Sequence, residues 1–235
     1  MSRILIVVDA DAASPTTELM VSAIRQAIAA HPPLLPETHP TVEVVSIDTL
    51  STTNTEESGD KYLTLTLNVP DALNLPGASV YKACRDVVGL RQVVEQMGYP
   101  TGAGCFWLPL VLTAKGPIYG EVIGLAEECT GKEISEELSL FNLKYQQPVH
   151  LADAKRQPLY HLGYRLLQYL SAPPATYLLQ FGFKDEKIVF DRLWPYPAAP
   201  AIASINIQEP DLFICHWHCL TAKPIFDLTI TPSLS

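Results

Sequence analysis

The sequence predicts an α/β protein, a single unit with a mixed sheet that starts with a β-α-β segment and continues with antiparallel hairpins. Residues 3–9 form a continuous aliphatic run, which is typical of a strand buried on both faces of a parallel sheet. Apolar residues at helical spacing follow it, and a second β-branched run starts at Val42. Farther along, two pairs of strand-like runs flank short turns, which indicates hairpins.

The β-α-β segment has clear boundaries. Ser14 or Thr16 can cap the helix, Pro15 suits its first turn, and the prolines after residue 31 end it. The helical crossover is expected to place the strand over 42–47 parallel to the first strand, and such crossovers are almost always right-handed.

The next part of the chain alternates loop, strand and helix. Residues 49–60 hold a single aliphatic side chain and predict a solvated loop. The alternation of apolar and polar residues over 62–68 predicts a half-exposed strand. A helix over 80–97 follows, capped by Ser79 and closed by Gly98.

The remaining segments complete the sheet and add one helix. Leucines at helical spacing mark a helix over 154–170, and the glutamate-rich residues 127–137 predict an excursion or short helix at the surface. The predicted strands are 105–113 with 118–125 as one hairpin, 176–183 with 187–194 as another, and 212–219 and 225–230 at the end.

The composition argues against several classes of protein. Hydrophobic residues make up 48 % of the chain, which excludes a wholly disordered protein. The net charge of −9 with 16 basic residues argues against a nucleic-acid partner. No apolar run approaches the ~20 residues that a membrane helix needs, so we expect no membrane contact and a cytoplasmic location.

Charge and cysteine content bear on the domain organisation. We expect one domain over 1–235, within which the acidic excess of the first part marks two sub-lobes, 1–78 and 79–235. Five cysteines, an odd number at wide spacing, argue against a disulfide framework.

The first candidate ligand site is the turn after the first strand. Ligands of doubly wound sheets gather at the carboxyl ends of strands, and a helix N-terminus can hold a phosphate. The turn offers two carboxylates and three hydroxyls, from Asp9, Asp11, Ser14, Thr16 and Thr17. Three interpretations stay open: a phosphate or flavin site, a divalent-metal site at the two aspartates, and an N-cap beside solvated carboxylates.

With Thr17-Glu18 at the helix start, this turn resembles the phosphate loop of flavodoxins over residues 9–18, although it lacks that family's glycine. The resemblance implies a flavin phosphate at the helix N-terminus.

A second candidate site lies on the predicted helix over 154–170. His161 and Arg165 are four residues apart and share a helix face, where they could bind a carboxylate or a phosphate. The alternative is a hydrated helix face with no ligand. On the second hairpin, Asp191 and Arg192 are interpreted as an ion pair.

The pentad over 215–219 holds two cysteines, a tryptophan and two histidines. In a strand, His216 and His218 would share one face and could supply two metal ligands. The further ligand would be a carboxylate or a third imidazole from elsewhere, for which His150 or His161 are candidates. The alternative, which we expect, is an end strand with solvated imidazoles and no metal.

Aromatic residues alternate with prolines after the second hairpin. In one interpretation Trp194 packs inside and the prolines cover a sheet edge. In the other, Trp194 and Tyr196 form a homodimer contact, since twofold association is common and interfaces favour these residue types.

The later chain resembles two groups of proteins. Leu159–Gly182 and Phe190–Pro197 resemble uncharacterised proteins of cyanobacteria, which implies no particular activity. The helix, the strand pair and the acidic, proline-bearing stretch after them are similar to the last lobe of ATP-grasp ligases. The chain lacks that family's glycine-rich lid loop and its Glu-x-Asn metal motif after the hairpin, and it offers only Asp191, with no neighbouring carboxylate.

No motif fixes a reaction or a cofactor. The sequence lacks a Walker lysine loop, Gly-x-Ser-x-Gly, His-Glu-x-x-His and Cys-x-x-Cys. The function predicted is therefore a non-catalytic ligand-binding or protein-interaction protein. The alternative is an enzyme that acts on a nucleotide or phosphorylated small molecule through an ATP-grasp-like or flavodoxin-like site.

Overall fold

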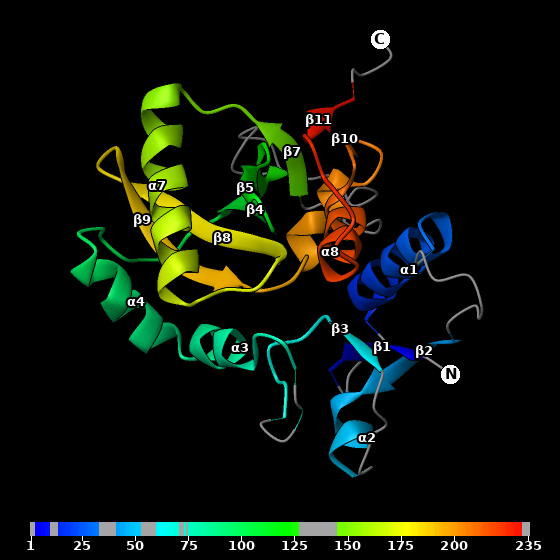
Figure 1. Ribbon diagram of the computed structural model, residues 1–235. Coiled ribbons are helices and arrows are strands. Elements are labelled where there is room, and N and C mark those ends of the chain that lie inside the picture. The colour runs from blue at the N-terminus through cyan, green and yellow to red at the C-terminus, as the bar shows by residue number, and fades with distance from the viewer. Residues whose placement is uncertain are drawn as a thin grey trace.

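The computed structural model describes residues 3–9, 14–32, 41–52, 60–70, 73, 75–126 and 145–231. Two main sheets and the helices around them make up the described part of the chain (Figure 1). The α/β class, the parallel start and the antiparallel hairpins are confirmed. The parallel and antiparallel strands lie in separate sheets rather than in one mixed sheet.

The first sheet is parallel and follows the predicted β-α-β pattern. Its strand order is β2-β1-β3, with the aliphatic strand β1 buried in the middle. The N-cap of helix α1 is Ser14, as the sequence predicts, and its apolar stripe packs into the core. The elements are β1 (Arg3–Val8), α1 (Pro15–Ala30), β2 (Thr41–Ser46), α2 (Ile47–Thr52) and β3 (Lys61–Thr64).

The second sheet is antiparallel, with the order β7-β6-β4-β8-β9 and β5 paired to β4. Both predicted hairpins are present, β4 with β5 and β8 with β9, but the strand predicted over 118–125 is divided between β5 and β6. The strands are β4 (Phe106–Thr113), β5 (Gly116–Tyr119), β6 (Val122–Leu125), β7 (Tyr145–Val149), β8 (Ala175–Lys184) and β9 (Lys187–Trp194). A short pair, β10 (Gln208–Glu209) and β11 (Thr229–Ile230), forms a third sheet.

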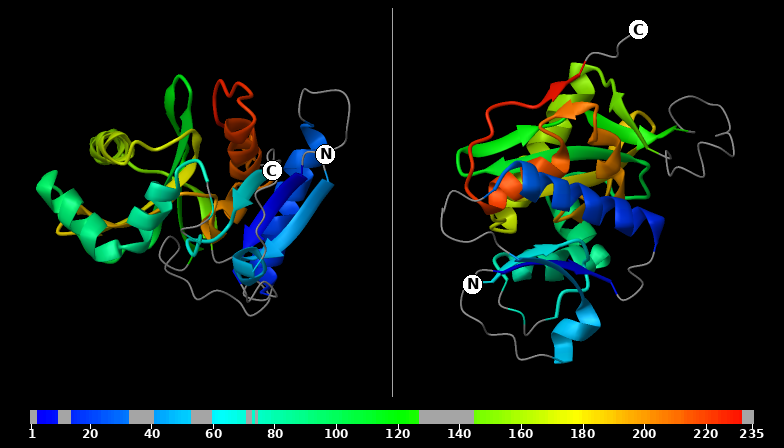
Figure 2. Two further views of the ribbon diagram at one scale, coloured as in Figure 1. Left: turned by 60° about the horizontal axis from the view of Figure 1, so that its bottom comes forward. Right: turned by 90° about the vertical axis from the view of Figure 1, so that its right-hand side faces the viewer.

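Helices cover both faces of the antiparallel sheet. One face packs against α3, α4 and α7 through residues such as Leu110, Leu162 and Phe181. The other face packs against α8, which lies between this sheet and α1 (Figures 1 and 2). These helices are α3 (Ala78–Arg85), α4 (Val87–Gln96), α7 (Asp153–Tyr169) and α8 (Leu212–Leu220), and a 3-10 turn η1 (Ala199–Ser204) precedes α8.

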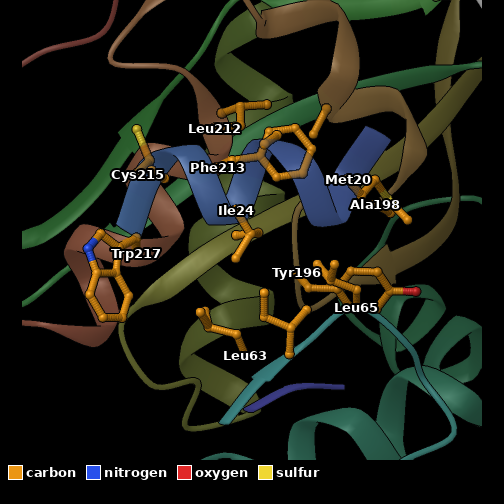
Figure 3. Packing of buried hydrophobic residues seen from close by; sticks show 14 of the residues in the cluster. Met20, Ile24, Leu63, Leu65, Tyr196, Ala198, Leu212, Phe213, Cys215 and Trp217 are labelled. Carbon is orange, nitrogen blue, oxygen red and sulfur yellow. The ribbon is translucent and has the colours of Figure 1, made fainter. Parts of the chain in front are cut away.

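The core around α8 joins the two sheets. The Trp217 indole N–H donates to the carbonyl of His31 at 2.7 Å, which fixes α8 to the end of α1. Figure 3 shows the side chains that meet there from α8, α1 and the strand region of β3, which include Met20, Ile24, Leu63, Leu65, Phe213 and Trp217. Burial of this many apolar groups stabilises the contact between the sheets.

Two predicted elements are wrong in type or extent. The segment predicted as a strand over 212–219 is helix α8, whose N-cap Asp211 accepts hydrogen bonds from Phe213 N and Ile214 N, each at 2.9 Å. The helix predicted over 80–97 is divided at Asp86, and it starts after Gly77, whose positive φ of 82° replaces the expected Ser79 cap.

Smaller differences concern loops and strand lengths. Helix α2 occupies the start of the loop predicted over 49–60, and residues 53–59 and 127–137 lie outside the described residues. The strands predicted over 62–68 and 225–230 are shorter than expected. No helix within the described part of the chain is both long and apolar enough to cross a membrane. The single domain over 1–235, with its sub-lobes, stays a prediction.

Candidate functional site

A β-bulge in the β8–β9 hairpin places a charged residue inside the antiparallel sheet. Gln180 pairs with Arg192 and Phe181 pairs with Phe190, so Asp191 is the extra residue on β9. Bulges of this kind redirect a side chain, and they are frequent next to functional sites. The Asp191 carboxylate is thereby turned to the start of β4 and to helix α4.

Three donors surround the Asp191 carboxylate, which is only 5 % exposed. Arg91 Nη2 donates to Oδ1 at 2.5 Å, the Gly104 N–H donates to Oδ2 at 3.0 Å, and Arg192 Nε lies 3.4 Å from Oδ1. Arg91 Nε also donates to the Asp191 carbonyl at 2.9 Å. The carboxylate is thus held by two cations and one backbone donor.

Arg192 stands at the accessible edge of this group. Its side chain is 36 % exposed and lies over the Trp194 ring at 5.6 Å. The Trp194 indole N–H donates to Gln180 Oε1 at 3.0 Å, and Gln180 Nε2 donates to the Gly104 carbonyl at 2.7 Å. We call Arg91, Gly104, Gln180, Asp191, Arg192 and Trp194 together the hairpin cluster.

The hairpin cluster carries a surplus of positive charge. Two guanidinium groups share one carboxylate, and no partner of Arg192 Nη1 or Nη2 is found among the described residues. A guanidinium group can bind a carboxylate or a phosphate through two parallel hydrogen bonds. A guanidinium group and an aromatic side chain can also each stack on a planar group of a ligand. The arrangement suits an anionic ligand with a planar group.

The same geometry does not fit a divalent metal. Metal sites of this type need several carboxylate oxygens. Asp191 is the carboxylate of the cluster, its oxygens already accept from Arg91 and Gly104, and both neighbouring side chains that contact it are cations. Within the described residues, no group of three or more His, Cys, Asp or Glu residues could hold an ion. The hairpin cluster therefore does not fit a divalent-metal site.

The turn after β1 is organised by its own hydrogen bonds. Asp9 Oδ1 accepts from Thr66 Oγ1 at 2.6 Å and from Asn68 Nδ2 at 3.0 Å, across the carboxyl ends of β1 and β3. Ser14 Oγ accepts from the Thr17 N–H at 3.1 Å and lies 2.8 Å from Thr17 Oγ1. Asp11 lies outside the described residues, and Thr16 is half-buried in the first turn of α1. Ligand binding by this turn stays a prediction.

His161 and Arg165 share a face of α7 and attach that helix to the segment after α4. His161 Nδ1 lies 3.0 Å from Tyr99 Oη, and Arg165 Nη1 donates to the Met97 carbonyl at 3.1 Å. These contacts give both side chains a packing role. Binding of a carboxylate or phosphate by this pair stays a prediction.

His216 and His218 do not share the face that a strand would give them. On α8, His216 is 7 % exposed and its Nδ1 accepts from the Thr176 N–H at 3.2 Å. The His218 ring meets the His31 ring edge-on, with centroids 4.7 Å apart. The expectation of solvated imidazoles on an end strand is thus wrong, because the pentad lies in a helix packed on both sides.

Burial lowers the pKa of His216 from 6.5 to about 4, and burial, with the nearby His31 and Lys223, lowers that of His218 to about 4. Between pH 6.5 and 4 the unfolded chain therefore binds more protons, so stability falls as the pH falls. The substitution His216→Asn keeps an acceptor for the Thr176 N–H. It should reduce the decrease in the free energy of unfolding between pH 6.5 and 4 by up to about 3 kcal/mol. Urea denaturation at several pH values measures it.

The exposed His150 provides the matched control for this prediction. His150→Asn should leave the dependence of stability on pH as it is in the wild-type chain, since His150 is exposed whereas His216 is buried. The account would be contradicted if the free energy of unfolding of His216→Asn fell with pH as steeply as that of wild type.

Comparison with known proteins gives a likeness in structure but not in sequence. No family model matches the chain, and no curated protein does. Among solved structures, it is similar to glycinamide-RNase-transformylase T from Mycobacterium tuberculosis, with 15 % identity and a TM-score of 0.66 over 97 % of this chain and 82 % of that one.

Two further solved structures show the same likeness. N5-carboxyaminoimidazole synthetase from Staphylococcus aureus, complexed with ADP, has 8 % identity and a TM-score of 0.67 over 97 % of this chain and 79 % of that one. L-amino acid ligase from Bacillus licheniformis has 12 % identity and a TM-score of 0.63 over 95 % and 76 %.

These likenesses correct the function predicted from the sequence. The three solved structures named above are ATP-grasp-type enzymes, whereas the sequence predicts a non-catalytic ligand-binding or interaction protein. They agree with the similarity to ATP-grasp ligases and favour the alternative of an enzyme. At these identities the comparison shows the fold, and we conclude that this chain has the fold of ATP-grasp-type enzymes.

Proposed function

We propose that the chain is an enzyme that acts on a nucleotide or another phosphorylated small molecule, and that the hairpin cluster binds the phosphate. One observation carries the proposal: the cluster pairs two arginines with a single carboxylate, in a fold shared with an enzyme that was solved with ADP. In a chain of net charge −9, such a local positive site is a specific attraction for an anion.

Each member of the cluster has a part in this binding. Arg192 presents its terminal nitrogens to the phosphate, and the Trp194 ring gives a flat surface for a base. Gln180 fixes the Trp194 indole, while Arg91 and Gly104 hold Asp191 and thereby the backbone of the bulge. Arg192 and Trp194 on β9, with Gln180 on β8, are thus held in position before a ligand binds.

The chemistry that these residues supply is electrostatic. A guanidinium group stays protonated at physiological pH, so Arg192 cannot act as a general base. It stabilises negative charge on a phosphate and orients it, and charge stabilisation of this kind is often the largest contribution to catalysis.

Titration calorimetry with ADP tests the proposal. Arg192→Gln should weaken ADP binding about tenfold or more, because a charge-assisted hydrogen bond to the phosphate is lost. Adenosine, which lacks the phosphates, should bind weakly to both proteins. Arg25→Gln, an exposed arginine on α1, is the matched control and should bind ADP like wild type.

Two outcomes would overturn the proposal. One is a wild-type chain that shows no heat of binding with ADP. The other is an Arg192→Gln variant that binds ADP with unchanged affinity.

The homodimer and the cytoplasmic location stay separate predictions. Tyr196 is 6 % exposed and packs between Tyr81 and Trp194, so of the two aromatic residues only the half-buried Trp194 could reach a second copy. A dimer that sedimentation detects and that Trp194→Ala dissociates without unfolding would support this contact.

A further inference from the structure

A pocket between the β4–β5 turn and the segment after α8 shares no residue with the hairpin cluster. The turn between β4 and β5 forms one wall, and the segment after α8 forms the other; Figure 2 shows both segments projecting on the same side. Its volume is about 400 Å³, within the range of small-molecule sites. The residues that decide its chemistry are Lys115, Pro117, Ile118, Cys219, Lys223 and Phe226.

The walls of this pocket are mainly apolar. Pro117 and Ile118 line it from β5, and Ile225 and Phe226 line it from the segment after α8. Phe226 is 83 % exposed, the highest value among the large hydrophobic side chains of the described residues that are exposed. An exposed aromatic ring beside a pocket of this size is typical of a ligand-binding surface, because a ligand that covers the ring removes apolar area from water.

Two lysines give the pocket a positive charge. Lys115 is exposed at the β-turn, and Lys223 is half-buried, with its Nζ donating to the Pro32 carbonyl at 2.8 Å. None of the described lining residues is acidic. The nearby Asp227 lies outside the lining, and its Oδ1 accepts from the Leu228 N–H at 2.8 Å.

The two remaining polar side chains, Thr113 and Cys219, do not offset that charge. Thr113 Oγ1 donates to the Gly116 carbonyl at 2.9 Å. Cys219 Sγ donates to the Leu112 carbonyl at 3.4 Å, and burial raises the pKa of its thiol to about 12. The thiol is therefore neutral at physiological pH. The pocket thus combines mainly apolar walls with two cations.

We infer that this pocket binds a small organic anion with an apolar body, such as an aromatic sulfonate or a medium-chain carboxylate. The apolar walls cover the body of the ligand, and the Lys115 and Lys223 ammonium groups pair with its anionic head. The pocket shares no residue with the hairpin cluster, so its ligand can be tested without nucleotide present.

Fluorescence titration with 8-anilinonaphthalene-1-sulfonate tests the inference, since this probe joins an aromatic body to a sulfonate. The double variant Lys115→Gln/Lys223→Gln should bind the probe about tenfold more weakly or worse. The control Lys82→Gln/Lys184→Gln removes two exposed lysines elsewhere and changes the net charge equally, so it should bind like wild type. Phe226→Ala should also weaken binding, and thermal melting checks that each variant folds.

Competition with two ligands of equal length separates charge from apolar contact. Decanoate should displace the probe, and decanol should do so at least about tenfold less well, because it lacks the anionic head. The inference is overturned if wild type does not bind the probe, if the two double variants bind it alike, or if decanol competes as well as decanoate.

Discussion

Replacing Gly104 with alanine should destabilise the chain by about 3 kcal/mol or more, because the new methyl group has no room. An added Cβ would lie 2.2 Å from both the carbonyl carbon and oxygen of Phe181 and 2.8 Å from Gly182 N. These are backbone atoms of β8, which pairs with β4 over seven residues from Phe106 to Leu112, so they cannot yield without disturbing the sheet. Urea denaturation followed by circular dichroism measures the loss.

Gly102→Ala is the matched control for that substitution. Its added Cβ would meet only the Val189 side chain, at 3.6 and 3.7 Å, which is ordinary van der Waals contact. Its stability should stay within about 1 kcal/mol of wild type. Equal losses in the two variants would show that the close approach of Gly104 to β8 is not the cause.

Asp191→Asn should lower the free energy of unfolding by about 2–4 kcal/mol, since it removes the one carboxylate that two arginines share. The Arg91 side chain is 31 % exposed, so solvent partly screens its ion pair with Asp191. The lower limit of the range allows for this screening. The shape of the side chain and its contact with the Gly104 N–H are retained in this variant. The decrease in the free energy of unfolding therefore measures mainly the contribution of the negative charge of Asp191.

The control for Asp191 is another aspartate that contacts an arginine. Asp153 pairs with Arg156 at 2.5 Å, but its side chain is 79 % exposed. Asp153→Asn should lower the free energy of unfolding far less than Asp191→Asn does, because water screens an exposed pair. A double-mutant cycle of Asp191→Asn with Arg91→Met should show coupling, and additive losses would argue against the ion pair as the source of the effect.

The elements that the sequence predicts well are the ones set by local patterns. The aliphatic run of β1, the Ser14 cap of α1 and the two hairpins each depend on neighbouring residues. Hairpins pair strands that are adjacent in sequence, so the turn and the two flanking runs are sufficient to identify them.

Helix α8 shows why a buried helix is easily mistaken for a strand. Its residues pack on several sides, so polar positions do not mark a helical face, and a short apolar run has the same pattern in either structure. The available cue was Asp211, which precedes the run and caps it. The sheets also lie apart because α8 and α1 fill the space between them, which no local pattern reveals.

The hairpin cluster was only partly visible in the sequence. Asp191 and Arg192 are adjacent, and their predicted ion pair is confirmed. Arg91, Gly104 and Gln180 come from distant segments, and the bulge that brings them to Asp191 is a property of strand pairing. The similarity to ATP-grasp ligases came from the order of elements, which the shared fold supports.

The most direct test of the account is ADP binding measured by calorimetry in excess EDTA and again in excess Mg²⁺. If arginine rather than a metal recognises the phosphates, ADP should bind in EDTA at least as tightly as in Mg²⁺, because the metal would neutralise the charge that Arg192 attracts. Arg192→Gln should lose most of that binding. Binding that appears only with Mg²⁺, or that strengthens about tenfold when Mg²⁺ is added, would contradict the proposed phosphate site.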